Sequence, residues 1–223
     1  MADLPVSHVD LFLAGLDDKS KSRGSLIFAL DATASREETW DMAIDLQGQM
    51  FREVAAIGGL DMQLVYFRGA TGINRECRAS VWVDDPMRLA KMMTKIRCEG
   101  GYTQIGRVLE HVARETAKRS VNAVVYVGDA CEEEREYLIL PARVLSGLGI
   151  PVFMFQEGRD PAVQQQFREI AEVTGGAYHR FDQGSAKLLA ELLRAVAAFA
   201  VGGLVALEKQ DSAAAKLLLS QMR

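Results

Sequence analysis

The sequence predicts a three-layer, doubly wound α/β fold in which a mostly parallel six-stranded sheet carries helices on both faces. Over residues 25–207, short apolar runs typical of buried strands alternate with longer amphipathic stretches typical of helices. One connection, between residues 67 and 77, is too short for a parallel crossover and indicates a hairpin. We therefore expect the strand order 3-2-1-4-5-6, with the third strand antiparallel at the edge.

Composition favours a single large domain. The chain has 223 residues, of which 49% are hydrophobic and 25% charged, values ordinary for a globular protein. We expect a lead-in over residues 1–24, the domain over residues 25–207, and a tail over residues 208–223 that holds a short apolar helix at residues 213–222. The net charge of −4 gives no reason to expect nucleic acid as a partner.

The same features predict a cytoplasmic protein. The first residues lack the basic start and apolar core of a signal peptide, and the three cysteines have no metal-like pairing and suggest reduced thiols. Residues 188–207 are apolar, but Glu191, Arg194 and a glycine pair interrupt them. We expect this segment to be a core-packed helix and not a membrane span.

The individual elements follow from periodicity and turn signals. Residues 26–30 form a continuous apolar run, as expected of a strand buried on both faces. A helical pattern over residues 36–57 ends at a glycine pair. The other expected strands cover residues 62–67, 77–83, 121–127, 151–155 and 177–181. The other expected helices cover residues 87–96, 104–118, 137–148, 161–173 and 185–207, and Pro141 is expected to shorten or bend one of them.

Polar oxygens gather after two of these strands. Asp31, Thr33 and Ser35 follow the first strand at alternating positions, and Asp129 follows the fourth. Thr103 lies in a glycine-rich loop before the helix that leads to the fourth strand. Since ligands bind at the carboxyl ends of the strands in such sheets, we expect these side chains to converge on one crevice. Hard oxygens without His or Cys suit Mg²⁺ or Mn²⁺ and, as a lesser candidate, Ca²⁺.

In these residues the chain resembles the von Willebrand factor A (VWA) domain family and its metal-ion-dependent adhesion site (MIDAS). That family's pattern is Asp-x-Ser-x-Ser after the first strand, a Thr before a helix, and an Asp after the fourth strand. Asp31-Ala-Thr33-Ala-Ser35, Thr103 and Asp129 match it in order and setting, although Thr33 stands for the first Ser. The resemblance implies that Asp31 and Asp129 act mainly through waters while the hydroxyls bind the metal directly.

Three residues beside this site are candidates for a rim that contacts a partner. Tyr102 precedes Thr103, and Glu132 and Glu133 follow Asp129. The two glutamates also fit a simpler role, as acidic residues that favour the amino end of a helix. Tyr102 fits an ordinary exposed loop position equally well.

These residues predict a metal-dependent protein-binding module that accepts an Asp or Glu carboxylate from a partner protein. The resemblance implies an adaptor or assembly factor of the intracellular bacterial type, some of which work with AAA+ ATPases. The alternatives are a Mg²⁺-dependent hydrolase or phosphohydrolase that uses Asp31 or Asp129, and a scaffold with a vestigial site. The sequence has no P-loop, no dinucleotide fingerprint after a strand and no Gly-x-Ser-x-Gly elbow, so we expect no enzymatic activity.

Overall fold

The computed structural model describes residues 23–36, 59–70, 75–182 and 185–222. The expected lead-in and the expected helix over residues 36–57 lie outside these ranges, apart from a few end residues.

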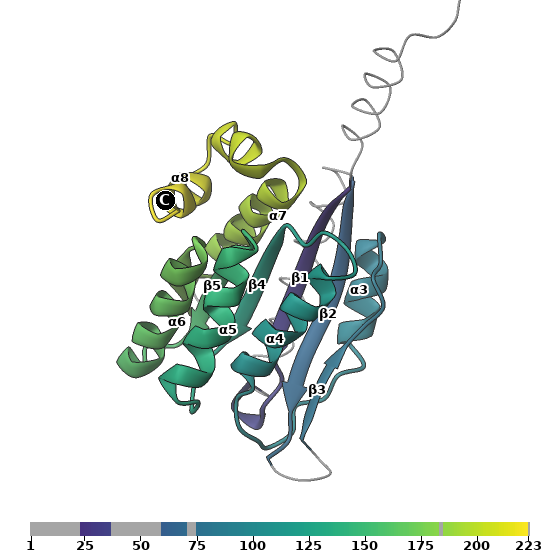
Figure 1. Cartoon of the computed structure of the whole chain (residues 1–223), viewed down its shortest axis with the longest axis vertical. Coiled ribbons are helices and arrows are strands. Elements are labelled where there is room, and N and C mark those ends of the chain that lie inside the picture. The colour runs from purple at the N-terminus through teal and green to yellow at the C-terminus, as the bar shows by residue number, and fades with distance from the viewer. Residues whose placement is uncertain (1–22, 37–58, 71–74, 183–184, 223) are drawn as a thin grey trace, which may run out of the picture.

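A single mixed sheet forms the middle layer of the domain (Figure 1). Its strand order is β3-β2-β1-β4-β5-β6, and all neighbouring pairs are parallel except β2 and β3. The strands are β1 (Gly24–Asp31), β2 (Leu60–Arg68), β3 (Glu76–Ala79), β4 (Ala123–Gly128), β5 (Val152–Glu157) and β6 (Tyr178–Phe181). The predicted order and the antiparallel edge strand are confirmed.

Helices cover both faces of this sheet. The described helices are η1 (Ala34–Arg36), α3 (Pro86–Met93), α4 (Ile105–Thr116), α5 (Arg135–Gly147), α6 (Pro161–Thr174), α7 (Ala186–Glu208) and α8 (Ala213–Leu219). Helices α4, α5 and α6 lie on one face, and α3 and α7 lie on the other (Figure 1). The predicted three-layer architecture is therefore confirmed.

Strand β1 lies at the centre of the core. Its eight residues are all buried, and alternate side chains point to opposite faces. Ile27 and Ala29 pack with α4, α5 and α6, while Phe28 and Leu30 pack with α3 and α7. Burial on both faces explains why this strand is a continuous apolar run.

The third strand is shorter than the predicted range of residues 77–83. Ser80 interrupts it, because its backbone N–H donates to the Leu64 carbonyl while its Oγ accepts from the Leu64 N–H. Pairing returns as an isolated bridge between Met62 and Val83. Three steps from Ser80 to Val83 thus oppose two steps from Leu64 to Met62, as in a β-bulge.

The long helix α7 breaks at a glycine pair. Gly202 and Gly203 have non-helical backbone angles, with a φ of 64° at Gly203 that favours glycine. By length and composition alone α7 could cross a membrane, but half of its most apolar window is buried. Leu192 and Val196 are fully buried in the core beneath the sheet.

The tail helix α8 folds back onto α7. Its Ala214, Ala215 and Leu218 side chains are buried within the same core cluster. Ser212 caps the helix, since its Oγ accepts from the Ala215 N–H at 3.0 Å. In this structure the tail is docked on the domain.

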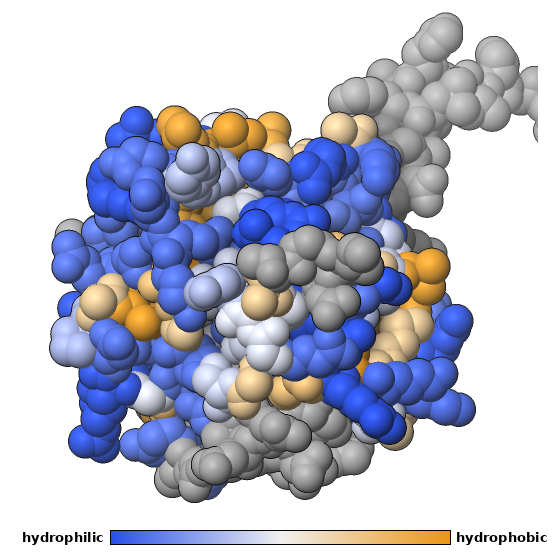
Figure 2. Space-filling view, turned by 90° about the horizontal axis from the view of Figure 1, so that it is seen from below, coloured by the Kyte–Doolittle hydropathy of each residue, from blue (hydrophilic) through white to orange (hydrophobic). Residues whose placement is uncertain are grey.

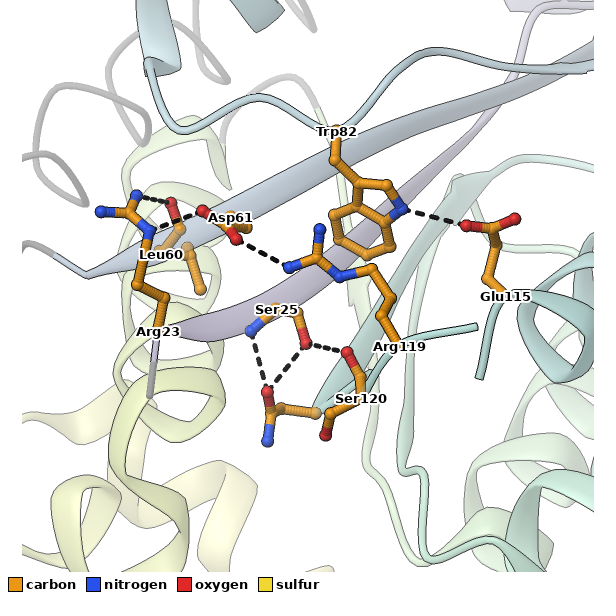
Figure 3. A network of polar contacts seen from close by, with 9 residues as sticks. Arg23, Ser25, Leu60, Asp61, Trp82, Glu115, Arg119 and Ser120 are labelled. Atoms are coloured by element: carbon orange, nitrogen blue, oxygen red, sulfur yellow. Dashed lines mark hydrogen bonds and ion pairs between the residues drawn. The ribbon is translucent and has the colours of Figure 1, made fainter. Parts of the chain in front are cut away.

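A polar network ties the opposite end of the sheet, where β1 and β2 begin (Figure 3). Asp61 accepts hydrogen bonds from Arg23 at 2.6 Å and from Arg119 at 2.7 Å. The Arg119 guanidinium also lies 4.2 Å from the ring centroid of Trp82, whose Nε1 donates to Glu115. This network joins the chain before β1 to the end of α4, away from the carboxyl ends of the strands.

Candidate metal centre

The local fold after β1 brings three oxygen-bearing side chains together. Asp31 ends the strand and is fully buried, and its Oδ1 accepts a hydrogen bond from the Thr33 N–H at 2.8 Å. Such an Asp turn reverses the chain in two residues. The Thr33 Oγ1 and the exposed Ser35 Oγ then lie 3.0 Å apart.

Contacts between segments place Thr103 and Asp129 at the same edge of the sheet. Because β1 pairs with β4 up to Leu30 and Val127, Asp129 leaves the sheet beside the end of β1. The chain before Thr103 runs parallel to residues 32–33, since the Glu99 N–H donates to the Ala32 carbonyl at 3.1 Å. The three segments that carry the predicted site therefore meet. Figure 2 views the molecule from below, where blue hydrophilic residues surround white, tan and grey ones near the middle.

A reciprocal pair of hydrogen bonds joins the second and third segments. The Thr103 N–H donates to Glu132 Oε2 at 3.0 Å, and the Glu132 N–H donates to Thr103 Oγ1 at 3.1 Å. Thr103 is only 1% exposed, so this pair holds its hydroxyl in the interior. The Glu132 carboxylate, predicted at the partner rim, is engaged with this loop.

Glu133 caps the amino end of α4. Its two carboxylate oxygens accept from the backbone N–H groups of Ile105 and Gly106. Burial raises the pKa of Glu133, and the two N–H groups act in the opposite direction. The sequence pattern predicted Glu133 at the start of the following helix. Its carboxylate caps α4, a contact that only the tertiary fold creates.

Two glycines allow the Thr103 loop to lie this close to its neighbours. A Cβ at Gly101 would lie 2.4 Å from the backbone of Gly69, after β2. A Cβ at Gly106 would lie 2.7 Å from the Tyr137 carbonyl of α5. Both contacts are with backbone atoms, which have little freedom to move.

The candidate site holds two carboxylates and one unsatisfied oxygen. Asp129 Oδ1 is buried and has no hydrogen-bond partner among the described residues. The fully buried Tyr126 has a pKa well above its ordinary value of 10.0, first because of burial and then because of the Asp31 carboxylate. The Asp129 carboxylate also raises the pKa of Tyr126. Such a site favours a cation.

The donor set fits a hard divalent cation. It comprises the carboxylates of Asp31 and Asp129 and the hydroxyls of Thr33, Ser35 and Thr103. Among the described residues, no cluster of three or more His, Cys, Asp or Glu side chains could hold a metal ion, so a centre here depends on the hydroxyls. The Asp129 Oδ1 atom is buried and has no hydrogen-bond partner among the described residues. A bound cation or its water would supply the missing partner.

Tyr102 directly precedes the candidate ligand Thr103. Its side chain is 56% exposed, whereas the adjacent Thr103 is buried. Tyr102 is therefore available for contacts at the surface, whereas Thr103 is confined to the interior. Of the three residues predicted for the rim, Tyr102 and Glu132 are exposed and Glu133 is half-buried; Glu132 is already bonded to the Thr103 loop, so Tyr102 is the exposed one that makes no such bond.

Comparison with known proteins identifies the fold. No protein-family profile and no curated protein sequence matches the chain. A von Willebrand factor type A structure from Catenulispora acidiphila superposes with a TM-score of 0.61 at 17% identity, over 81% of this chain and 43% of that one. An aerotolerance-related membrane protein from Bacteroides fragilis gives 0.59 at 18% identity, over 76% and 98%. The VWA domain of SpRpn10 gives 0.57 at 12% identity, over 72% and 88%.

The chain spans less than half of the Catenulispora structure, and all three identities are below one fifth. Similarity at this level shows the fold alone. The roles of the site residues depend on their own geometry. Sheet order, helix placement and these superpositions agree: the chain has a VWA-like fold.

Proposed function

We propose that this chain is a divalent-metal-dependent protein-binding module that takes a carboxylate from a partner protein. A VWA-like fold suggests a protein-interaction or adhesion module. The observations that support the finer proposal are the meeting of the three segments that carry the five oxygen-bearing side chains and the buried oxygen of Asp129 that has no hydrogen-bond partner among the described residues.

Each residue has a role that follows from its position. Thr33, Ser35 and Thr103 offer neutral hydroxyl oxygens, and Asp31 and Asp129 supply the negative charge behind them. A bound Mg²⁺ or Mn²⁺ would supply an electrophilic centre that seeks one more anionic oxygen. Asp31 Oδ1 is already held by the Thr33 N–H, so it keeps the turn in place before any ligand arrives.

The natural donor of the additional oxygen is an Asp or Glu side chain of another protein. Tyr102 would contact the surface around that side chain. A cytoplasmic partner, including one from an AAA+ ATPase system, agrees with the three cysteines, which form no disulfide in this structure. Two carboxylates in the crevice would disfavour densely acidic partner surfaces and tolerate a single carboxylate among neutral groups.

Calorimetric titration of Mg²⁺ and Mn²⁺ into three proteins tests the proposal. The wild type is expected to bind, Asp129→Ala is expected not to bind, and Asp84→Ala is the control because Asp84 is exposed and away from the crevice. Affinity capture from the native cell extract with and without EDTA then tests metal-dependent partner binding. Equal metal binding by the wild type and Asp129→Ala would refute the assignment of the site.

Partner binding is separated from metal binding by Thr103→Ala. This variant is expected to capture less partner while keeping most of its metal affinity. The other four oxygen-bearing side chains of the site stay in place. A partner that survives both EDTA and Thr103→Ala would show that its interface lies elsewhere on the domain.

A further inference from the structure

Strand β6 leaves one side of its backbone outside the sheet. It is the last strand in the order and pairs only with β5. Met154 and Gly158 donate to the carbonyls of Ala177 and Phe181, so alternate residues from 177 to 181 turn their backbone groups toward β5. Tyr178 and Arg180 consequently turn theirs outward.

The chain itself satisfies one of these outward groups. The Tyr178 N–H donates to Oε1 of Gln221, a side chain just beyond α8, at 3.0 Å. The Tyr178 carbonyl and the Arg180 N–H have no hydrogen bond to α8 among the described contacts, while the His179 side chain interacts with the Arg180 backbone. The side-chain amide of Gln221 thus takes the hydrogen bond from Tyr178 that an added strand would otherwise accept.

A groove of about 620 Å³ lies along this edge. Helix α6 forms one wall and the end of α8 forms the other, and both helices lie at the same side of the molecule (Figure 1). The polar side chains that line it are Gln164, Arg168, Glu172, His179, Arg180 and Gln221. The groove therefore offers both open backbone groups and flanking side chains.

The charge of the groove selects its occupant. Arg168 and Arg180 are exposed, and within the described part of the chain neither forms an ion pair. The Arg168 guanidinium lies 5.1 Å from the ring centroid of Tyr178, which holds it over the strand edge. Glu172 is the one carboxylate among the lining residues, so the groove is net positive.

This charge also argues against a second copy of the chain as the occupant. Pairing β6 with β6 would bring the two arginine pairs of both copies together, and like charges across paired strands are destabilising. A charged residue on a short edge strand is a common device against such self-association.

We infer that the groove beside β6 is a docking site for an extended, acidic segment of a partner protein, which adds to the sheet as a seventh strand. Main-chain hydrogen bonds to Tyr178 and Arg180 would supply affinity, and Arg168 and Arg180 would select acidic side chains. This site is separate from the metal centre, and it does not depend on the proposed function.

The test uses the full chain and a labelled eight-residue peptide of alternating Val and Glu, measured by fluorescence anisotropy. A Val–Lys peptide controls for sequence, and a Val–Glu peptide N-methylated at alternate residues controls for main-chain pairing. The Val–Glu peptide is expected to bind, while the other two are expected not to bind. Arg168→Gln with Arg180→Gln is expected to weaken binding roughly three- to tenfold, and the exposed Arg143→Gln on α5 is expected to leave it unchanged.

Gln221→Ala provides an independent check, because it removes the side chain that an added strand must displace from Tyr178. It is expected to tighten peptide binding. Three results would overturn the inference: no binding of the Val–Glu peptide, equal binding of its N-methylated form, or binding insensitive to the two arginines. Sedimentation showing a wild-type dimer that Arg180→Pro dissolves would assign the edge to a second copy instead.

Discussion

Thr103 and Glu132 bind each other twice, each through its backbone N–H and the other's side-chain oxygen, at 3.0 and 3.1 Å. The Glu132 N–H occupies one acceptor position of the Thr103 hydroxyl and leaves the remaining lone pair for the crevice. Glu132 thereby orients the candidate metal ligand Thr103, although Glu132 is not itself a candidate ligand.

Removing the Glu132 carboxylate is therefore expected to loosen the Thr103 loop. We expect Glu132→Ala to lower the free energy of unfolding by about 1 kcal/mol, because the Thr103 N–H loses its acceptor. Glu134→Ala is the matched control, since this exposed neighbour makes no side-chain cap on α5. Urea denaturation measures both, and equal stability of the two variants would show that the reciprocal pair contributes nothing.

We expect Asp129 to lower the stability of the metal-free protein and to contribute to metal binding. Without metal, Asp129→Ala removes a buried oxygen that has no partner among the described residues, so unfolding should become harder by about 1 kcal/mol. With Mg²⁺ present, the wild type should gain stability as the metal concentration rises, while the variant should not. Thermal denaturation over a Mg²⁺ series measures both effects. A variant that is less stable than the wild type in EDTA would contradict this account.

Gly101 and Gly100 are adjacent in sequence but differ in their surroundings. A Cβ at Gly101 would lie 2.4 Å from the backbone of Gly69, whereas a Cβ at Gly100 would meet nothing within 4 Å. We expect Gly101→Ala to cost about 1–3 kcal/mol and to weaken metal binding, because the Thr103 loop must move. Gly100→Ala should change neither quantity. Chemical denaturation and metal titration of the pair make the comparison, and similar losses in both would point to glycine flexibility as the cause.

The network at the opposite end of the sheet predicts a pH dependence. Partial burial opposes ionisation of Asp61, but hydrogen bonds from Arg119 and Arg23 outweigh it and hold its pKa below the ordinary value of 3.8. A lowered pKa in the folded state means that the contribution of Asp61 is present above pH 3.8 and is lost as the pH falls through the folded value. Asp61→Asn should therefore reduce stability at neutral pH and flatten the acid limb of the stability curve. An unchanged acid limb would show that other carboxylates dominate it.

Several features could be predicted from the sequence because they depend on local pattern. The buried run of β1, the short hairpin connection and the alternation of strands with helices together determine the sheet order. The placement of Asp31 and Asp129 at neighbouring strand ends follows from that order alone. The identity of the side chains then predicts the kind of site.

Other features could not be predicted because they depend on contacts across the fold. Glu133 caps α4 from 28 residues away, and nothing in its sequence neighbourhood indicates this partner. The side chain of Ser80 interrupts β3 by bonding to Leu64, although the sequence alternates as a strand would. The outward edge of β6 and its contact with Gln221 likewise appear only once α8 is placed.

The break in α7 also has a consequence for synthesis of the chain. Before the domain closes, the nascent segment Lys187–Glu208 presents the length and apolar character by which membrane-insertion machinery selects its clients. The glycine pair limits the unbroken helix to Ala186–Val201, which extends about 24 Å, shorter than the hydrocarbon core of about 30 Å. The break at the glycine pair therefore leaves a continuous helix shorter than a bilayer span requires.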